Sequence, residues 1–148
     1  MRVTEPPMSL IYWDTMLFVY WFEEHPIHTE RIRHILTRME QRKDALCTSS
    51  FAVAETLVGP YKKGARDTIS RIREALRPPF VQVLPFTSDA ADHYARIRAE
   101  LSVSAADAIH LACAAQAGVD LFLTNDHGLV GQIVPGIQFI AELDSNIF

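Results

Sequence analysis

Four acidic side chains each stand alone in an otherwise uncharged stretch of this 148-residue chain, and none of these stretches contains a Lys or Arg. They are Asp14, Glu55, Asp107 and Asp126. An isolated carboxylate in apolar surroundings is costly to bury unless it is protonated, hydrogen-bonded or close to a cation. A fold that packs these four stretches together must supply such partners from elsewhere, and a shared metal ion would serve all four.

Each acid also has a simpler explanation when it is taken alone. Asp14 and Asp126 are suited to capping a helix or shaping a turn. Asp107 completes the pattern Ser104-x-x-Asp107, which is typical of a capping box. Glu55 could lie on a narrow exposed strip of a mostly buried helix. Four such coincidences at strand ends and helix starts of one domain are harder to accept than a common site.

The overall composition indicates one folded domain, but the charge is unevenly distributed. The net charge is −4 and 49% of the residues are hydrophobic, which is ordinary for a globular protein. Residues 31–77 nevertheless hold 11 of the 14 Lys and Arg side chains and only 5 of the 18 Asp and Glu side chains. This segment is either a pair of solvated helices with basic outer faces or a surface that binds phosphates or an acidic partner.

The sequence shows no clear pattern for disulfide formation, secretion or membrane insertion. Cys47 and Cys113 lie in apolar runs with no CxxC motif and no Cys/His cluster, so we expect two reduced core residues of a cytoplasmic protein. No signal peptide and no membrane span are predicted. The Pro6-Pro7 pair indicates a flexible tail over residues 1–8 followed by a single domain over residues 9–148.

Short apolar segments alternate with amphipathic ones along the chain. The segments expected to be strands are 10–13, 45–48, 80–84, 120–124 and 137–140. The segments expected to be helices are 17–23, 29–42, 49–58, 62–76, 88–101 and 105–117, with Gly59-Pro60 expected to end the third of them. Strands separated by helices predict a parallel sheet that is covered on both faces.

The order of these elements places the acids at one edge of such a sheet. Sites in open α/β folds form beyond the carboxyl ends of the strands. Asp14 and Asp126 follow the first and fourth strands, and Glu55 and Asp107 lie near the starts of helices. A cluster of acids without His or Cys prefers Mg²⁺ or Mn²⁺, and such ions support phosphodiester hydrolysis. Without metal, mutual repulsion is expected to raise at least one carboxyl pKa.

Three segments resemble the motifs of the PIN-domain family. The most specific is the run Ser104-Ala-Ala-Asp107-Ala-Ile-His-Leu-Ala-Cys-Ala-Ala-Gln-Ala-Gly118-Val-Asp-Leu-Phe-Leu-Thr124-Asn-Asp126, which is similar to the C-terminal signature of the family. Trp13-Asp14-Thr15 is similar to the first motif, and Ser49-Ser50 followed by Ala54-Glu55-Thr-Leu57 is similar to the second. The resemblance extends over residues 10 to about 140.

This resemblance implies a three-layer α/β/α domain with a five-stranded, mostly parallel sheet in the order 3-2-1-4-5. It implies a Mg²⁺- or Mn²⁺-dependent endoribonuclease whose catalytic and metal-binding residues are Asp14, Glu55, Asp107 and Asp126, with Thr15 and Thr124 in support. The chain most resembles VapC-type toxins of type II toxin–antitoxin pairs. A homodimer, an RNA substrate and a small inhibitory antitoxin are then expected. The basic residues expected to contact RNA are Arg31, Arg38, Lys62, Lys63 and Arg66.

Two positions depart from the family pattern, and they keep an alternative open. Met16 stands where many members have Asn or Ser, and His127, Gly128 and Leu129 stand where many have a further Asp. A catalytically weak or inactive module that binds RNA or protein is therefore the alternative. A DNA-directed nuclease would use the same residues. A Ser/His/Asp hydrolase built on His110 lacks the GxSxG elbow, so His110 is expected to be a packed or hydrogen-bonded helix residue.

Overall fold

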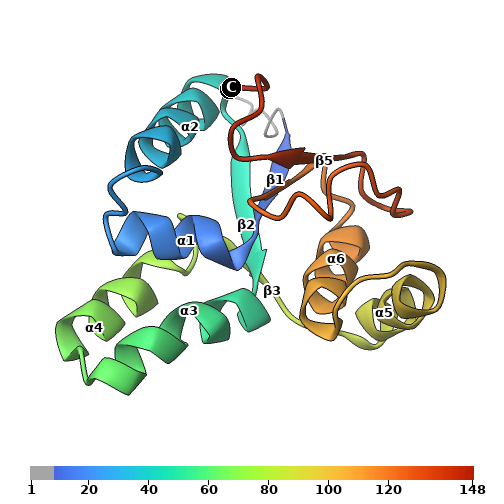
Figure 1. The fold of residues 1–148 in the computed structure, drawn as a ribbon, viewed down its shortest axis with the longest axis horizontal. Helices are drawn as coiled ribbons and strands as arrows, with labels where there is room; N and C mark the ends of the chain where they lie inside the picture. The colour runs from blue at the N-terminus through green and yellow to red at the C-terminus, as the bar shows by residue number, and fades with distance from the viewer. Residues whose placement is uncertain (1–8) are drawn as a thin grey trace, which may run out of the picture.

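The computed structural model describes residues 9–148, so the tail expected at 1–8 lies outside the described residues. Strands and helices alternate along the described part of the chain in the expected manner (Figure 1). The strands are β1 (Leu10–Trp13), β2 (Ala45–Ser49), β3 (Gln82–Leu84), β4 (Leu121–Thr124) and β5 (Phe139–Glu142). The helices are α1 (Thr15–Phe22), α2 (Thr29–Arg42), α3 (Ser50–Lys63), α4 (Arg66–Ala75), α5 (Ser88–Glu100) and α6 (Ala105–Ala117).

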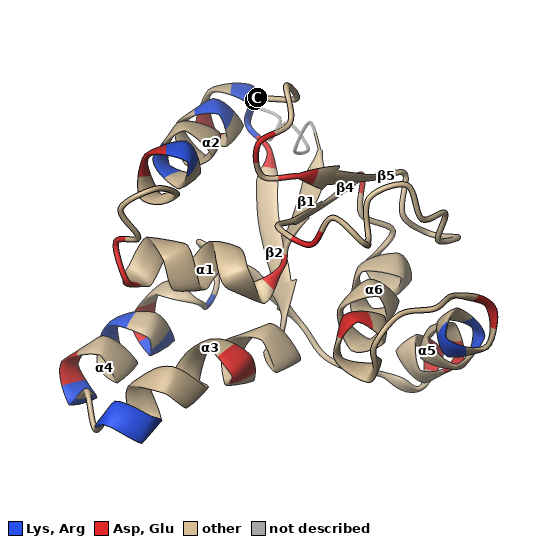
Figure 2. Ribbon diagram, in the orientation of Figure 1, with Lys and Arg blue, Asp and Glu red and all other residues tan. Residues whose placement is uncertain are grey.

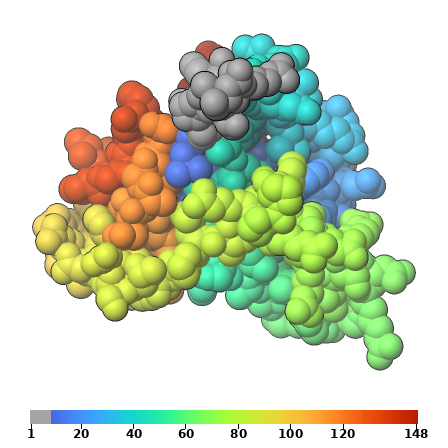
Figure 3. All heavy atoms as spheres, turned by 180° about the vertical axis from the view of Figure 1, so that it is seen from behind, coloured from blue at the N-terminus to red at the C-terminus, as the bar shows by residue number. Residues whose placement is uncertain are grey.

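The sheet confirms the predicted order. Its strands follow the sequence β3-β2-β1-β4-β5, and each of the four neighbouring pairs is parallel. In Figure 1 the helices α1 to α4 lie on one side of the sheet and α5 and α6 on the other. From behind, the stretch between α4 and α5, which includes the edge strand β3, crosses the molecule in yellow-green (Figure 3). The fold is the predicted three-layer α/β/α arrangement.

Residue alternation along β1 and β4 divides the interior into two cores. Ile11 and Trp13 belong to the core that includes α1, α2 and α4, whereas Tyr12 belongs to the core with α5 and α6. Leu123 and Phe122 of β4 divide in the same way. Successive side chains of a strand point to opposite faces, so a strand covered on both sides is apolar throughout. This explains why β1 and β4 read as continuous apolar runs.

The third helix is longer than the sequence signals predict. The expected stop at Gly59-Pro60 is wrong, because α3 runs on to Lys63 and contains Pro60 in its last turns. Proline fixes φ near a helical value, but it removes one hydrogen bond and crowds the carbonyl four residues back, so it weakens α3 here without ending it. The helix ends instead at Gly64, which has φ 63° and whose N–H donates to a carbonyl of the last turn. The next helix, expected to begin at residue 62, therefore begins at Arg66.

The two edge strands also differ from expectation. β3 begins at Gln82 instead of residue 80, and β5 lies two residues later than predicted. An edge strand pairs on one side only, so its ends are set by one neighbour and by the preceding loop. The turn before β5 contains Gly136 with φ 99°, and Gln138 N–H then donates to the carbonyl of Val119. These tertiary contacts set the start of β5.

Both cysteines are free and buried, as expected. Burial raises the pKa of the Cys47 thiol to about 12 and that of Cys113 to about 11. Thiols with such pKa values are poor nucleophiles near neutral pH, because very little thiolate is present. Among the described helices, none combines the length and the apolar character that a membrane crossing requires.

The turn before β5 generates a stability prediction. A Cβ added at Gly136 would lie 2.6 Å from the carbonyl oxygen of Ala115 in α6, whereas Gly131, with φ 90°, has nothing within 4 Å. Gly131→Ala should cost about 1 kcal/mol through backbone strain alone, and Gly136→Ala should cost clearly more, about 2–4 kcal/mol. Urea unfolding of both variants measures the difference. Equal losses would show that the approach to α6 does not constrain this turn.

Candidate active site

Asp14 lies where β1 passes into α1, and both of its carboxylate oxygens are held. Its backbone N–H donates to Leu123 O of β4 at 3.0 Å, which extends the pairing of the two strands. Asp14 Oδ1 caps α1 by accepting from Thr15 N at 2.8 Å, and Oδ2 accepts from the Thr124 hydroxyl at 2.8 Å. The residue is only 9% exposed. The cap explanation is therefore correct, and it coexists with a position at the carboxyl edge of the sheet.

Thr124 joins the first and last acids. Its hydroxyl donates to Asp14 Oδ2 and accepts from the backbone N–H of Asp126 at 3.0 Å. The side chain that it supports directly is thus Asp14, while it orders only the backbone of Asp126. The carboxylate of Asp126 accepts from Gly128 N at 2.8 Å, so the loop that follows β4 folds around it.

Glu55 enters from α3 and is held by two donors at one oxygen. Its Oε1 accepts from the Thr15 hydroxyl at 2.6 Å, and Nε2 of His110 lies at 2.6 Å from the same oxygen. The side chain of Glu55 is 33% exposed, so it lies at the wall of the site. Glu55 is partly exposed, as expected for a narrow exposed strip. Its hydrogen bonds to Thr15 and His110 nevertheless hold it next to Asp14.

His110 is the residue of this site that sequence reasoning missed. It is 2% exposed, and its Nε2 also lies 3.5 Å from Asp14 Oδ1. Its Nδ1 lies 2.7 Å from the hydroxyl of Tyr12. The expectation of a hydrogen-bonded helix residue is correct, yet its partners make it part of the acidic site. The available signal was its spacing of three residues from Asp107, which places both on one face of α6.

Asp107 lies in the first turn of α6, whose N-terminus is capped by Ser104 Oγ accepting from Asp107 N at 3.1 Å. Burial raises the pKa of the Asp107 carboxyl, and the charges of Asp14 and Asp126 raise it further. The Ser104 hydrogen bond and His110 act in the opposite direction. The raised pKa agrees with the expectation for at least one acid of the group, but burial contributes more to it than the repulsion that was expected to cause it.

The four acids line one hollow of about 240 Å³ at the carboxyl edge of the sheet. Figure 2 shows acidic segments of α3 and α6 facing the gap between the two helical layers. Exposure increases from the buried Asp14 to the exposed Asp126. The lining residues are Asp14, Thr15, Met16, Glu55, Ala106, Asp107, His110, Asn125 and Asp126.

The hollow is lined by the right donors but is not a closed coordination cluster. Over residues 9–148, no group of three or more His, Cys, Asp and Glu side chains is close enough in this arrangement to hold a metal ion. None of the described lining residues is Lys or Arg. Carboxylate oxygens with no local cation are the donor set that a hard divalent ion prefers, so the residues fit Mg²⁺ or Mn²⁺.

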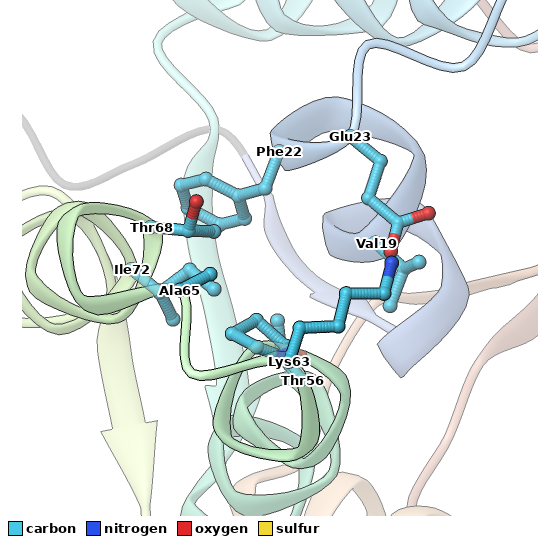
Figure 4. A pocket seen from close by; sticks show the side chains of 9 residues that line it. Val19, Phe22, Glu23, Thr56, Lys63, Ala65, Thr68 and Ile72 are labelled. Atoms are coloured by element: carbon cyan, nitrogen blue, oxygen red, sulfur yellow. The ribbon is translucent and has the colours of Figure 1, made fainter.

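The Lys and Arg residues lie mainly on α2, around the junction of α3 and α4, and on α5 (Figure 2). Arg31 holds the C-terminal segment, since its guanidinium donates to Leu143 O at 2.8 Å and Ser145 O at 2.5 Å. Lys63 lines a second cavity of about 420 Å³ between α1, α3 and α4, where Figure 4 shows it together with Glu23. That cavity contains one acid only, so it is not an alternative site for the same chemistry.

Comparison with known proteins decides the family. The model of the PIN domain matches residues 11–130, which includes all four acids. This chain belongs to the PIN-domain family. PIN domains are nucleases, a class of hydrolase. No curated protein sequence matched the chain.

Several solved structures share the fold of this PIN domain. VapBC2 from Rickettsia felis, bound to a promoter DNA fragment, aligns with a TM-score of 0.73 and 18% identity over 90% of this chain and 98% of that one. A toxin–antitoxin complex from Klebsiella pneumoniae aligns with a TM-score of 0.65 and 22% identity, over 86% of this chain and 94% of that one. The sarcin–ricin loop cleaving toxin VapC20 of Mycobacterium tuberculosis aligns with a TM-score of 0.62 and 16% identity, over 76% of this chain and 86% of that one. At these identities the likeness establishes the fold.

The raised pKa of Asp107 predicts how stability depends on pH. The unfolded chain loses this proton near the ordinary value, and the folded chain loses it at higher pH, so stability should fall across that interval and stay lower above it. Asp107→Asn should therefore gain stability relative to the wild type as pH rises from about 4 to 7. Thermal unfolding at several pH values in EDTA measures this.

The control is Asp89→Asn, which removes an exposed acid from the first turn of α5. It should lose only the favourable helix-dipole contribution, about 0.3–1 kcal/mol. If Asp107→Asn is destabilised as much as Asp89→Asn at neutral pH, the burial and neighbouring charges of Asp107 do not destabilise its ionised form.

Proposed function

We propose that this PIN domain is a Mg²⁺- or Mn²⁺-dependent endoribonuclease and the toxin of a type II toxin–antitoxin pair. The observation that carries the proposal is the convergence of Asp14, Glu55, Asp107 and Asp126 on one hollow. These acids come from four separate segments of the chain, and structural capping alone does not require them to share a cavity. A site of this kind suits phosphodiester hydrolysis better than acyl transfer, because it offers carboxylates and no activated Ser or Cys.

The same four carboxylates are the residues that would hold the ion. A bound divalent cation would lower the pKa of a coordinated water and stabilise negative charge on a phosphate. The protein contributes the orientation of the carboxylates: Thr15 donates to Glu55 and, through its backbone, to Asp14, while Thr124 donates to Asp14. Without a cation these charges would repel an RNA phosphate, so the proposal makes activity strictly dependent on the ion.

The proposed substrate is single-stranded or looped RNA. Cleavage requires a phosphate that can enter an open hollow at the protein surface, and unpaired RNA exposes its backbone in this way. VapC20, which shares the fold, is described as cleaving the sarcin–ricin loop, and we extend looped RNA to this chain as a proposal. Arg38, Lys62, Lys63 and Arg66 are the basic residues proposed to hold the RNA backbone. Arg31 is proposed with them, although its hydrogen bonds to the C-terminal segment limit its reach.

The proposed partners follow from the same comparison. Several solved structures of this fold are toxin–antitoxin complexes, among them VapBC2, so we propose a small antitoxin that covers the acidic site. We also propose a homodimer and a cytoplasmic location, where RNA is accessible and the two buried thiols would stay reduced. These assignments depend on the nuclease proposal and fall with it.

Asp14→Asn tests the mechanism because it removes the charge and retains a good helix cap. We expect RNA cleavage to fall by at least about 100-fold, since loss of a residue that merely orients a metal ligand already costs 10–100-fold. The measurement is cleavage of a mixed RNA pool with Mg²⁺, Mn²⁺ or EDTA. Asp92→Asn is the control, because this exposed acid on α5 forms an ion pair with Arg96 on the surface and should not affect cleavage.

Two results would discard the mechanism: cleavage that persists in EDTA, or cleavage retained in both Asp14→Asn and Asp107→Asn. The alternative of a non-catalytic binding module has one structural observation in its favour. Met16, which is 42% exposed, lines the hollow where many PIN domains have Asn or Ser. RNA binding without Mn²⁺ binding would favour that alternative.

A further inference from the structure

A buried hydrogen-bonded chain connects the interior of the sheet to the acidic hollow through His110. The hydroxyl of Tyr12 in β1 donates to Ser49 Oγ at 2.8 Å and lies 2.7 Å from Nδ1 of His110. The other ring nitrogen of His110 meets Glu55 at 2.6 Å. Tyr12, Ser49 and His110 are all buried, and His110 also lines the hollow, where its Nε2 meets Glu55.

The direction of the contact with Glu55 follows from donor chemistry. An ionised carboxylate can only accept hydrogen bonds, so the proton in the 2.6 Å contact belongs to Nε2 of His110. On the other side, a hydroxyl can donate or accept. The Tyr12 hydroxyl, 2.7 Å from Nδ1, can take either role. The ring therefore points a donor at the carboxylate of Glu55, and its other nitrogen faces the Tyr12 hydroxyl.

This donor and the Thr15 hydroxyl meet the same oxygen of Glu55. Both contacts are to Oε1, at 2.6 Å each. Within residues 9–148, no hydrogen bond to Oε2 is found, so the second oxygen is left for a ligand of the hollow. Nε2 also lies 3.5 Å from Oδ1 of Asp14, so the imidazole stands between two carboxylates that would otherwise face each other. A histidine that served packing alone would not need to reach either acid.

We propose that His110 is a positioning residue of the cation site: it fixes Glu55 through one oxygen and thereby presents the other to an incoming divalent ion. The proposal deepens the nuclease function proposed above and rests on it. Orienting groups behind metal ligands are worth about 10–100-fold in metal affinity. His110 acts through Glu55, so its contribution should disappear when Glu55 cannot be oriented in this way.

Calorimetric titration with Mn²⁺ tests this on the full-length protein. His110→Met fills a similar volume without a donor, and we expect about 10–100-fold weaker Mn²⁺ binding. His110→Gln retains an N–H donor and should recover most of the lost affinity. In a Glu55→Gln background, His110→Met should cause no further loss, which is the non-additivity expected of two residues that act as one unit. His34→Met is the control, because His34 is an exposed residue of α2.

Proton NMR provides a readout that needs no metal. The Nε2 proton of His110 is buried against a carboxylate, so it should give a slowly exchanging imidazole resonance in the wild type. That resonance should shift in Glu55→Gln and vanish in His110→Met. Absence of the resonance, with the fold intact by circular dichroism, would overturn the proposal.

The outcomes separate the two proposals. Wild-type Mn²⁺ affinity in His110→Met, or an equal loss in both Glu55 backgrounds, would overturn the role of His110 while leaving the nuclease proposal intact. If the Mn²⁺ affinities follow the predicted pattern but the protein cuts no RNA, the nuclease proposal falls and the positioning role of His110 stands. If the wild type binds no Mn²⁺, the nuclease mechanism fails, and the role of His110 as a positioning residue of a cation site fails with it.

Discussion

The parallel pairing of β1 with β4 is the contact on which the acidic hollow depends. Trp13 lies opposite Leu123, and the next backbone N–H along β1, that of Asp14, donates to Leu123 O. This register places Asp14 beside Thr124 at the carboxyl edge of the sheet. A shift of one residue would turn each side chain to the other face, so it would disrupt both cores and separate Asp14 from its hydroxyl donor. The packing of β1 and β4 side chains into the two cores therefore fixes the strand register, and the register in turn fixes the geometry of the site.

The site tolerates its negative charge because the carboxylates of Asp14, Glu55 and Asp126 accept hydrogen bonds. Asp14 is held by a backbone N–H and a hydroxyl, Glu55 by a hydroxyl and an imidazole, and Asp126 by backbone N–H of its own loop. Asp107 is the one whose raised pKa records the burial and the neighbouring charges. The hydrogen bonds anchor the carboxylates without neutralising them. This leaves a residual repulsion that a divalent ion would relieve, so binding of the ion and stability of the fold should be coupled.

Local signals predicted most of the elements and singled out the four acids that line the hollow, and they failed where tertiary contacts decide. The four isolated carboxylates were visible in the sequence because their surroundings are uncharged, whereas the strand order came from the family resemblance. Pro60 was expected to end a helix, yet the left-handed position of Gly64 determines the end. His110 could not be assigned to the site, because its partners Tyr12 and Glu55 come from other elements. Its spacing of three residues from Asp107 places both on one face of α6, but that spacing does not name the partners from other elements.

The most direct measurement of the central claim is a crystal structure of the protein grown with Mn²⁺, in which anomalous scattering locates the ion. The account predicts a peak in the hollow, within about 2.5 Å of carboxylate oxygens from at least two of Asp14, Glu55, Asp107 and Asp126. The acids would be drawn together around it, with Glu55 using the oxygen that His110 does not hold. A peak elsewhere on the protein, or an empty hollow at millimolar Mn²⁺, would contradict it.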